Sequence, residues 1–150
     1  MFKHILLPTD GSELSDKAAR QAVKMAKVLG AKITVMNVIP NYRRAVSERY
    51  NMPPLLAAPV RRKYETEALA ASNDILEHVY AAATAAGVEC ARVSVVSDVP
   101  FNAIIKQAAK SNCDVIMMAS HGRRGLQGLL LGSETQKVLV HSKIPVLVYR

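Results

Sequence analysis

Aromatic residues, cysteines and long apolar runs are all scarce in this chain of 150 residues. Tryptophan is absent and aromatic residues make up only 5%, while half of the chain is hydrophobic, so the core must consist of aliphatic side chains. No apolar run approaches the roughly 18 residues that a membrane-spanning helix needs. The first residues lack the pattern of a signal peptide. These absences predict a cytoplasmic protein with no membrane segment.

The two cysteines, Cys90 and Cys113, are too few for a disulfide framework and show no metal-ligand spacing. They are interpreted as small hydrophobic residues with reduced thiols.

Basic residues outnumber acidic residues by 20 to 12, which gives a formal net charge of +8. A basic chain raises the question of nucleic acid binding. However, few aromatic side chains are present to stack on bases, no nucleic-acid-binding motif occurs, and most basic residues are scattered. Nucleic acid is therefore disfavoured as a partner. Solvated surface charge is the simpler interpretation, and a basic chain also suits a polyphosphate ligand.

Short apolar runs alternate with stretches of helical periodicity along the whole chain. The predicted strands are His4–Leu7, Ile33–Ile39, Cys90–Val96, Val115–Ala119 and Ile144–Tyr149; the predicted helices are Glu13–Leu29, about Arg62–Ala86, one opened by Pro100, and Ser133 to about His141. This alternation predicts a single α/β domain over residues 1–150, with a doubly wound parallel sheet of five strands and helices on both faces. Residues 40–60 contain four prolines, which predict an irregular loop. Loops of this length are typically functional lids or disordered segments.

The stretch from Val115 to Gln136 predicts a phosphate-binding device. Five apolar residues typical of a buried strand lead into a loop with four glycines and two arginines, Arg123 and Arg124. The sequence Ser133-Glu134-Thr135-Gln136 then has the form of a capping box at a helix start, with Ser133 as N-cap. Glycines let backbone N–H groups approach an anion, and a helix N-terminus adds unpaired donors and a positive dipole end.

Ligands of doubly wound sheets bind beyond the carboxyl ends of the strands. Asp10, Val38 and Ala119 lie at or near three such ends and are expected to meet at one crevice. The last strand, residues 144–149, is apolar although a terminal strand often lies at a sheet edge. Pairing with the same strand of a second copy, in a two-fold homodimer, is the preferred explanation.

The motifs Pro8-Thr9-Asp10, Ala119-Ser120-His121-Gly122 and Gly132-Ser133, with the closing Ile144–Val148, resemble the universal stress protein family over essentially the whole chain. The resemblance implies strand order 3-2-1-4-5, a homodimer through the fifth strands and, in one branch, ATP binding through Gly-x2-Gly-x9-Gly-Ser/Thr. Gly122 and Gly132-Ser133 match the second half of that motif, whereas its first glycine falls on Ala119. A methyl group there is a small obstacle at negative φ and a serious one at positive φ.

Carried over position by position, the resemblance implies a complete nucleotide site. Val38 would offer its backbone to the adenine edge, and Met118 and Ala119 would floor the pocket. The base and ribose would be lined by Pro8, Thr9 and Asp10, with Asp10 also a candidate for a Mg²⁺ shell. The phosphates would lie among His121, Gly122, Arg123, Gly132, Ser133, Glu134 and Thr135. Other interpretations stay open: Asp10 as a cap of the first helix, Met118 as core, and His121 and Arg123 as solvated loop residues.

No catalytic set is visible, and no Gly-Lys-Ser/Thr of a Walker loop follows the glycines. Slow ATP hydrolysis is the most that is expected. The favoured hypothesis is a dimeric, ATP-binding regulator of the stress response, whose occupancy biases residues 40–60 and an unknown protein partner. The alternative is the same fold without nucleotide, acting through protein–protein contacts. A phosphoacceptor receiver domain is disfavoured because Gly11 and Ser12, rather than further acidic residues, follow Asp10.

Overall fold

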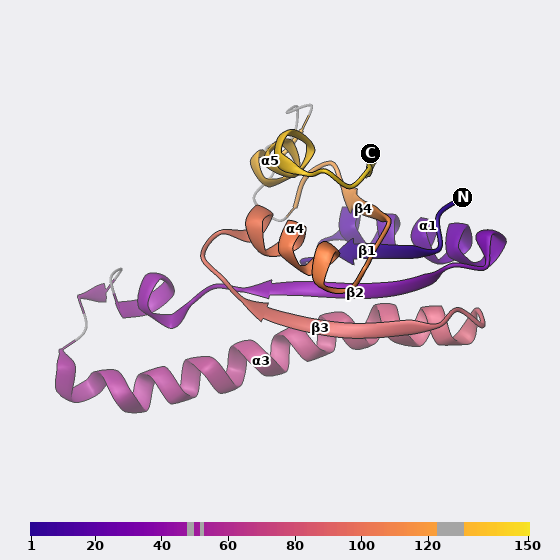
Figure 1. Ribbon diagram of the computed structural model, residues 1–150. Coiled ribbons are helices and arrows are strands. Elements are labelled where there is room, and N and C mark those ends of the chain that lie inside the picture. The colour runs from indigo at the N-terminus through magenta and orange to yellow at the C-terminus, as the bar shows by residue number, and fades with distance from the viewer. Residues whose placement is uncertain (48–49, 52, 123–130) are drawn as a thin grey trace.

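The computed structural model describes residues 1–47, 50–51, 53–122 and 131–150, without the side chains of residues 44, 47 and 54–57. Its elements follow one another as β1 (His4–Pro8), α1 (Glu13–Leu29), β2 (Lys32–Ile39), η1 (Arg43–Ser47), α3 (Pro54–Ala85), β3 (Cys90–Val96), α4 (Pro100–Lys110), β4 (Val115–Ala119), α5 (Ser133–His141) and β5 (Val146–Tyr149). The five strands form one parallel sheet in the order β3-β2-β1-β4-β5 (Figure 1). The predicted fold class and strand order are confirmed.

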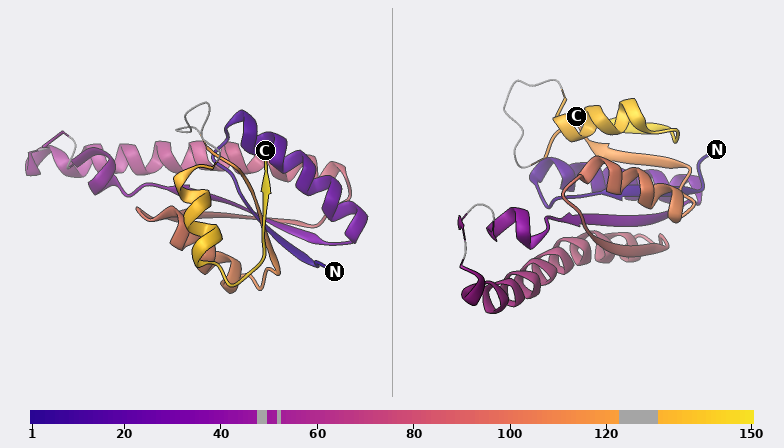
Figure 2. Two further views of the ribbon diagram at one scale, coloured as in Figure 1. Left: turned by 90° about the horizontal axis from the view of Figure 1, so that it is seen from above. Right: turned by 60° about the vertical axis from the view of Figure 1, so that its left-hand side comes forward.

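Helices cover both faces of the sheet (Figure 2), and an apolar core cluster lies between the sheet and the helices on each face. Alternate residues of a strand face opposite sides of the sheet. Ile5 and Leu7 of β1 therefore pack with buried residues of α1 and α3, whereas Leu6 packs on the other side with buried residues of α4 and α5. The core is aliphatic, as the composition predicts, and its largest members are fully buried.

Helix α1 shows how local sequence fixes an element beside the crevice. Its N-cap is Ser12, whose hydroxyl accepts a hydrogen bond from the backbone N–H of Ser15. The helix ends at Gly30, whose φ of 62° is left-handed and favours glycine. Both ends agree with the sequence prediction. The strand before α1 ends at Pro8, so that Thr9 and Asp10 belong to the connecting turn.

Residues 40–60 differ from the predicted irregular loop. The described part contains the short π-helical turn η1, and α3 begins at Pro54 instead of near residue 62. Proline fits the first position of a helix, where no intrahelical N–H bond is needed. Pro59 is accommodated inside the helix. The Tyr64 hydroxyl donates to the Pro40 carbonyl at 2.9 Å, which ties α3 to the end of β2. The start of α3 projects beyond the sheet (Figure 1).

One strand boundary also differs from the prediction. Strand β5 begins at Val146, two residues later than predicted. Among the described helices, none is long and apolar enough to cross a membrane.

Candidate functional site

The ends of β1 and β4 meet at the carboxyl edge of the sheet, where Gly122 lies against the side chain of Asp10. A Cβ atom built on Gly122 would stand 2.4 Å from Asp10 Oδ2 and 3.3 Å from its Cγ. Glycine is therefore the residue that leaves room for this carboxylate. The structure brings together two predicted site residues that are more than a hundred positions apart in the chain.

The turn after β1 is held by a compact set of hydrogen bonds. Thr9 is buried, and its hydroxyl donates to Ser15 Oγ at 3.1 Å and accepts from the Gly11 N–H at 3.2 Å. Asp10 Oδ1 accepts from the Ser12 N–H at 3.0 Å. Ser12 is the N-cap of α1, and Asp10 supports the start of the helix by accepting from the Ser12 N–H.

Asn37 is a site-supporting residue that the sequence prediction missed. Its side chain is buried, and Nδ2 donates to the Thr9 carbonyl at 2.8 Å, joining β2 to the turn after β1. Its signal in the sequence is the one amide side chain in a mostly apolar strand. A buried amide of this kind needs a partner, but the sequence does not say which one.

Val38 directs its backbone toward the crevice. In a parallel ladder, backbone groups of successive residues alternate between the two neighbouring strands. Met36 accepts from the Thr9 N–H on the β1 side, and Ile39 accepts from Ser97 on the β3 side. Val38 follows Met36 by two residues and so faces the β1 side, beyond the last β1–β2 pair, Pro8 with Met36. Its N–H and C=O point over the end of β1.

Gly132 lies against the residues that follow β4. Its N–H donates to the Ser120 carbonyl at 2.7 Å, and a Cβ there would stand 3.1 Å from His121 Cα. This close approach returns the chain from β4 to the start of α5. His121 is half-buried, and its Nδ1 lies 3.2 Å from Ser120 Oγ. Thr135 is buried and donates through its hydroxyl to the Ala119 carbonyl at 3.1 Å.

The predicted capping box at α5 is wrong. The N-cap is Gly132, Ser133 is the first helical residue, and no side chain caps the helix among the described residues. Gln136 Nε2 instead donates to the Leu131 carbonyl at 3.3 Å. The chain takes this form because Gly132 must pack against His121, which places the extended residue before the helix at 132 instead of 133. The first turn of α5 thus lacks the side-chain cap that serves α1.

The side chain of Glu134, a residue expected near the phosphates, contacts α4 and Lys137. Its Oε2 accepts from the Phe101 N–H in the first turn of α4 at 2.8 Å, and its Oε1 lies 2.9 Å from Lys137 Nζ. The carboxylate therefore serves the start of α4, where negative charge is favourable. Its side chain supplies no group for a phosphate in this arrangement.

Ala119 lies in β4, and its backbone is not among the described residues with positive φ. The ATP-binding motif has glycine at this position. The methyl group of Ala119 is only a small obstacle there, because a methyl group is compatible with strand geometry. Met118 and Ala119 are both buried at the end of β4, and Met118 packs in the core on the α4 side. Pro8 is half-buried beside them in β1.

Arg123, Arg124, Gly125 and Gly128 fall outside the described residues. Within the described part of the chain, no group of three or more His, Cys, Asp or Glu side chains could hold a metal ion. A Mg²⁺ ion beside Asp10 would therefore need phosphate oxygens and water as its other ligands. The thiols are unsuited to chemistry, because burial raises the pKa of Cys90 and raises that of Cys113 to about 11.

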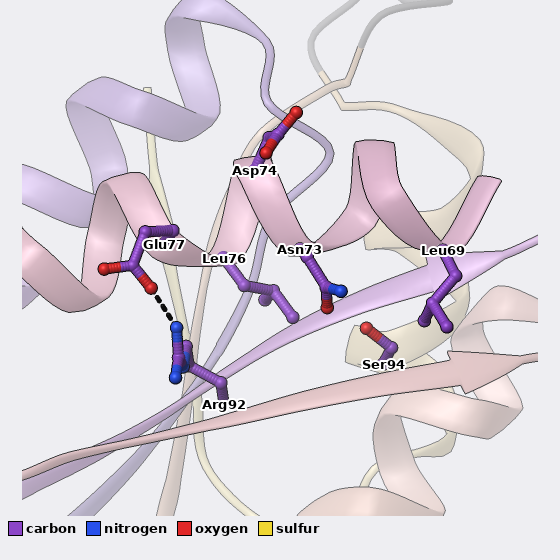
Figure 3. A pocket seen from close by; sticks show the side chains of 7 residues that line it. All are labelled: Leu69, Asn73, Asp74, Leu76, Glu77, Arg92 and Ser94. Atoms are coloured by element: carbon purple, nitrogen blue, oxygen red, sulfur yellow. Dashed lines mark hydrogen bonds and ion pairs between the residues drawn. The ribbon is translucent and has the colours of Figure 1, made fainter. Parts of the chain in front are cut away.

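A separate open cleft of about 580 Å³ lies between α3 and β3. Leu69, Asn73 and Leu76 of α3 point toward Arg92 and Ser94 of β3, and the Glu77–Arg92 ion pair joins the two elements (Figure 3). No predicted site residue lines this cleft. It is formed at the sheet edge, away from the contact between Asp10 and Gly122.

The parallel sheet in the order β3-β2-β1-β4-β5, with helices on both faces, defines a doubly wound α/β architecture. The family model described as "Universal stress protein family" matches residues 1–150. The chain belongs to the universal stress protein family. It is 30% identical to universal stress protein MJ0531 of Methanocaldococcus jannaschii, covering 100% of this chain and 83% of the relative. It is also 30% identical to universal stress protein YxiE of Bacillus subtilis, covering 100% of both.

The solved structures agree on the fold. The structure of the hypothetical protein MJ0577 has a TM-score of 0.78 at 29% identity and covers 99% of this chain and 95% of that one. A universal stress protein in complex with cAMP has a TM-score of 0.68 at 22% identity, covering 99% and 97%. The universal stress protein from Archaeoglobus fulgidus in complex with dAMP has a TM-score of 0.70 at 15% identity, covering 100% and 98%.

Proposed function

We propose that this chain is a nucleotide-binding universal stress protein that holds ATP, with Mg²⁺, at the carboxyl edge of its sheet. The single observation that carries the proposal is the start of α5. No described side chain caps this helix, and the Gly132–Ser120 hydrogen bond holds it beside the Asp10–Gly122 contact. Uncapped N–H groups at a helix N-terminus favour an anion such as phosphate.

The remaining surroundings fit an adenine nucleoside. The backbone of Val38 offers one donor and one acceptor, which suits the edge of a purine. Met118 and Ala119 supply an apolar floor, and the Asp10 carboxylate suits ribose hydroxyls or a Mg²⁺ shell. Two relatives of the same fold were solved with the adenine nucleotides cAMP and dAMP. These complexes support an adenine base as part of the ligand, but they do not support a triphosphate in particular.

Nucleotide occupancy would act as a signal in the cytoplasm. The segment that starts at Pro40 begins two residues after Val38 and is tied to α3 through Tyr64. A base bound at Val38 would bias residues 40–60 and, through them, a protein partner. In the alternative, the same fold acts through protein contacts without nucleotide.

Calorimetric titration of the full chain with MgATP tests the proposal. We expect saturable binding by the wild type and by Ala119→Gly, with affinities within about twofold, because residue 119 has strand geometry. We expect loss of binding in Gly132→Val, whose side chain would meet the His121 backbone. Absence of binding in wild type and Ala119→Gly alike would favour the alternative.

We also propose a homodimer through residues 144–149. Strand β5 lies at one edge of the sheet, and Leu147 is 36% exposed although it is in a strand. Exposed apolar edge strands favour pairing with another chain. Light scattering is expected to give a dimer for the wild type and a monomer for Leu147→Lys. A monomeric wild type at micromolar concentration would contradict the proposal.

A further inference from the structure

The outer face of α1 carries a single file of basic side chains. Lys17, Arg20, Lys24 and Lys27 recur at intervals of three, four and three residues, and all four are exposed. Residues with this spacing lie on one side of a helix. The file from Lys17 to Lys27 is about 15 Å long at the rise of an α-helix.

Lys24 and Lys27 have no acidic residue within one turn of α1, whereas Arg20 follows Asp16 by four residues and its charge acts on Glu13. Lys17 pairs with Glu13 at 2.6 Å, but no ion pair joins Arg20, Lys24 or Lys27 to any other described residue. From Lys17 to residue 47 the sequence holds seven Lys or Arg residues and no Asp or Glu. Like charges at three- and four-residue spacing destabilise an isolated helix. A concentration of one charge sign on one helix face points to a partner of opposite charge.

The setting of α1 disfavours duplex nucleic acid and a membrane surface. Its buried residues run from Ser15 to Ala26, so the helix lies flat on the sheet along its length. Because α3 lies beside it in the same layer, α1 could approach a major groove about 12 Å wide only together with that layer. Its neighbour α3 lies in the same layer and exposes Glu65, Glu67, Asp74 and Glu77 (Figure 2). Glu65 and Glu67 pair with the exposed Arg61 and Lys63, and Glu77 pairs with Arg92, so this part of α3 has no excess of positive charge. A flat anionic membrane would therefore be attracted by α1 and not by the layer as a whole.

A second helix fits the file. Two helices that pack side by side touch along one line of residues spaced three and four apart. Val28 lies beside Lys24 and Lys27 on the same surface and is 86% exposed, which offers such a helix an apolar contact.

We propose that the outer face of α1 docks an acidic helix of a partner protein, with carboxylates opposite Lys17, Arg20, Lys24 and Lys27 and an apolar side chain over Val28. The inference goes beyond nucleotide binding and is independent of it. The basic residues lie away from the proposed nucleotide site. Helix α1 begins near Asp10, at the carboxyl ends of the strands, and ends at their amino ends, where β2 begins.

The test is an NMR titration of the nitrogen-15-labelled full chain, without nucleotide, with a synthetic helical peptide. The peptide carries four glutamates spaced three, four and three apart and one leucine; an isomer of equal composition distributes the glutamates around the helix. We expect shift changes centred on residues 20–28 with the first peptide, and at least tenfold weaker binding of the isomer.

Charge reversal on the protein provides the matched control. The triple variant Arg20→Glu, Lys24→Glu, Lys27→Glu is expected to weaken binding of the first peptide at least tenfold. The variant Lys106→Glu, Lys110→Glu, Lys143→Glu makes the same change in net charge with exposed residues outside α1 and is expected to bind within twofold of the wild type. Circular dichroism confirms that both variants are folded.

Three results would overturn the proposal. Equal binding of both peptides, or equal weakening by both charge reversals, would show only general attraction between opposite charges. Tighter binding of a 20-base-pair DNA duplex or of phosphatidylserine vesicles at the same residues would assign the surface to nucleic acid or membrane.

Discussion

The close contact between Gly122 and Asp10 yields a sharp prediction for the variant Gly122→Ala. The new Cβ would stand 2.4 Å from Asp10 Oδ2, whereas ordinary contact begins near 3.4 Å, so the carboxylate must move by about 1 Å. Gly122 does not have a left-handed φ, so alanine adds no backbone strain of its own. The effect of the variant therefore reports the contact with Asp10.

The magnitude follows from the hydrogen bond that this movement would break. Asp10 Oδ1 accepts from the Ser12 N–H at 3.0 Å. A hydrogen bond of this kind contributes about 0.5–1.5 kcal/mol to the free energy of unfolding. For a chain of this size, about 1 kcal/mol corresponds to a fall in Tm of about 2–4 °C. The same displacement should weaken MgATP binding, because Asp10 faces the proposed ribose.

A double-mutant cycle with Asp10→Ala, measured by urea unfolding, isolates the cause. Without the carboxylate, alanine at position 122 has no atom to displace, and its cost is expected to fall below about 0.3 kcal/mol. An equal cost of Gly122→Ala in both backgrounds would refute the reasoning, because the contact with Asp10 would then explain none of it.

Two further predictions concern buried polar groups. Asn37→Leu removes the donor to the buried Thr9 carbonyl and is expected to lower the free energy of unfolding by about 1–3 kcal/mol; an unchanged urea midpoint would contradict this role. His4 is buried with Nε2 2.8 Å from Thr34 Oγ1, and burial, followed by the charge of Lys32, lowers its pKa below the ordinary 6.5. As pH falls, His4 therefore takes up a proton in the unfolded chain before it does so in the folded protein. The contribution of neutral His4 to the free energy of unfolding is complete above pH 6.5 and is lost as pH falls toward the lowered pKa. Urea unfolding between pH 7.5 and 5 should show this loss in the wild type and a smaller one in His4→Gln; equal losses would exclude His4 as the source.

The alternation of short apolar runs with helical periodicity was sufficient to predict every strand of the sheet. Gly30 and Ser12 have local roles, a left-handed helix end and a cap, so short-range chemistry located the ends of α1. Strand order came from the family resemblance, because pairing in a parallel sheet joins residues far apart in the chain.

The failures have long-range causes. Ser133 looks like an N-cap, but Gly132 takes that position because it packs against His121 across the crevice. The Glu134 side chain accepts from the start of α4, a contact that no local pattern indicates. Asn37 looked unremarkable because its partner, the Thr9 carbonyl, lies 28 residues away. None of these partners is adjacent in sequence.

The predicted start of α3 was wrong for a local reason. Pro53, Pro54 and Pro59 were interpreted as breakers, whereas Pro54 is the first residue of the helix and Pro59 lies inside it. Proline tolerates the first helical turn, so a cluster of prolines does not by itself exclude a helix start.

The central claim is tested most directly by identifying small molecules released when freshly purified protein is denatured, by chromatography and mass spectrometry. We expect close to one adenine nucleotide per chain from the wild type and none from Gly132→Val, with both proteins folded beforehand. A wild type that releases no nucleotide and also fails to take up added MgATP would contradict it, and the protein would then act without nucleotide.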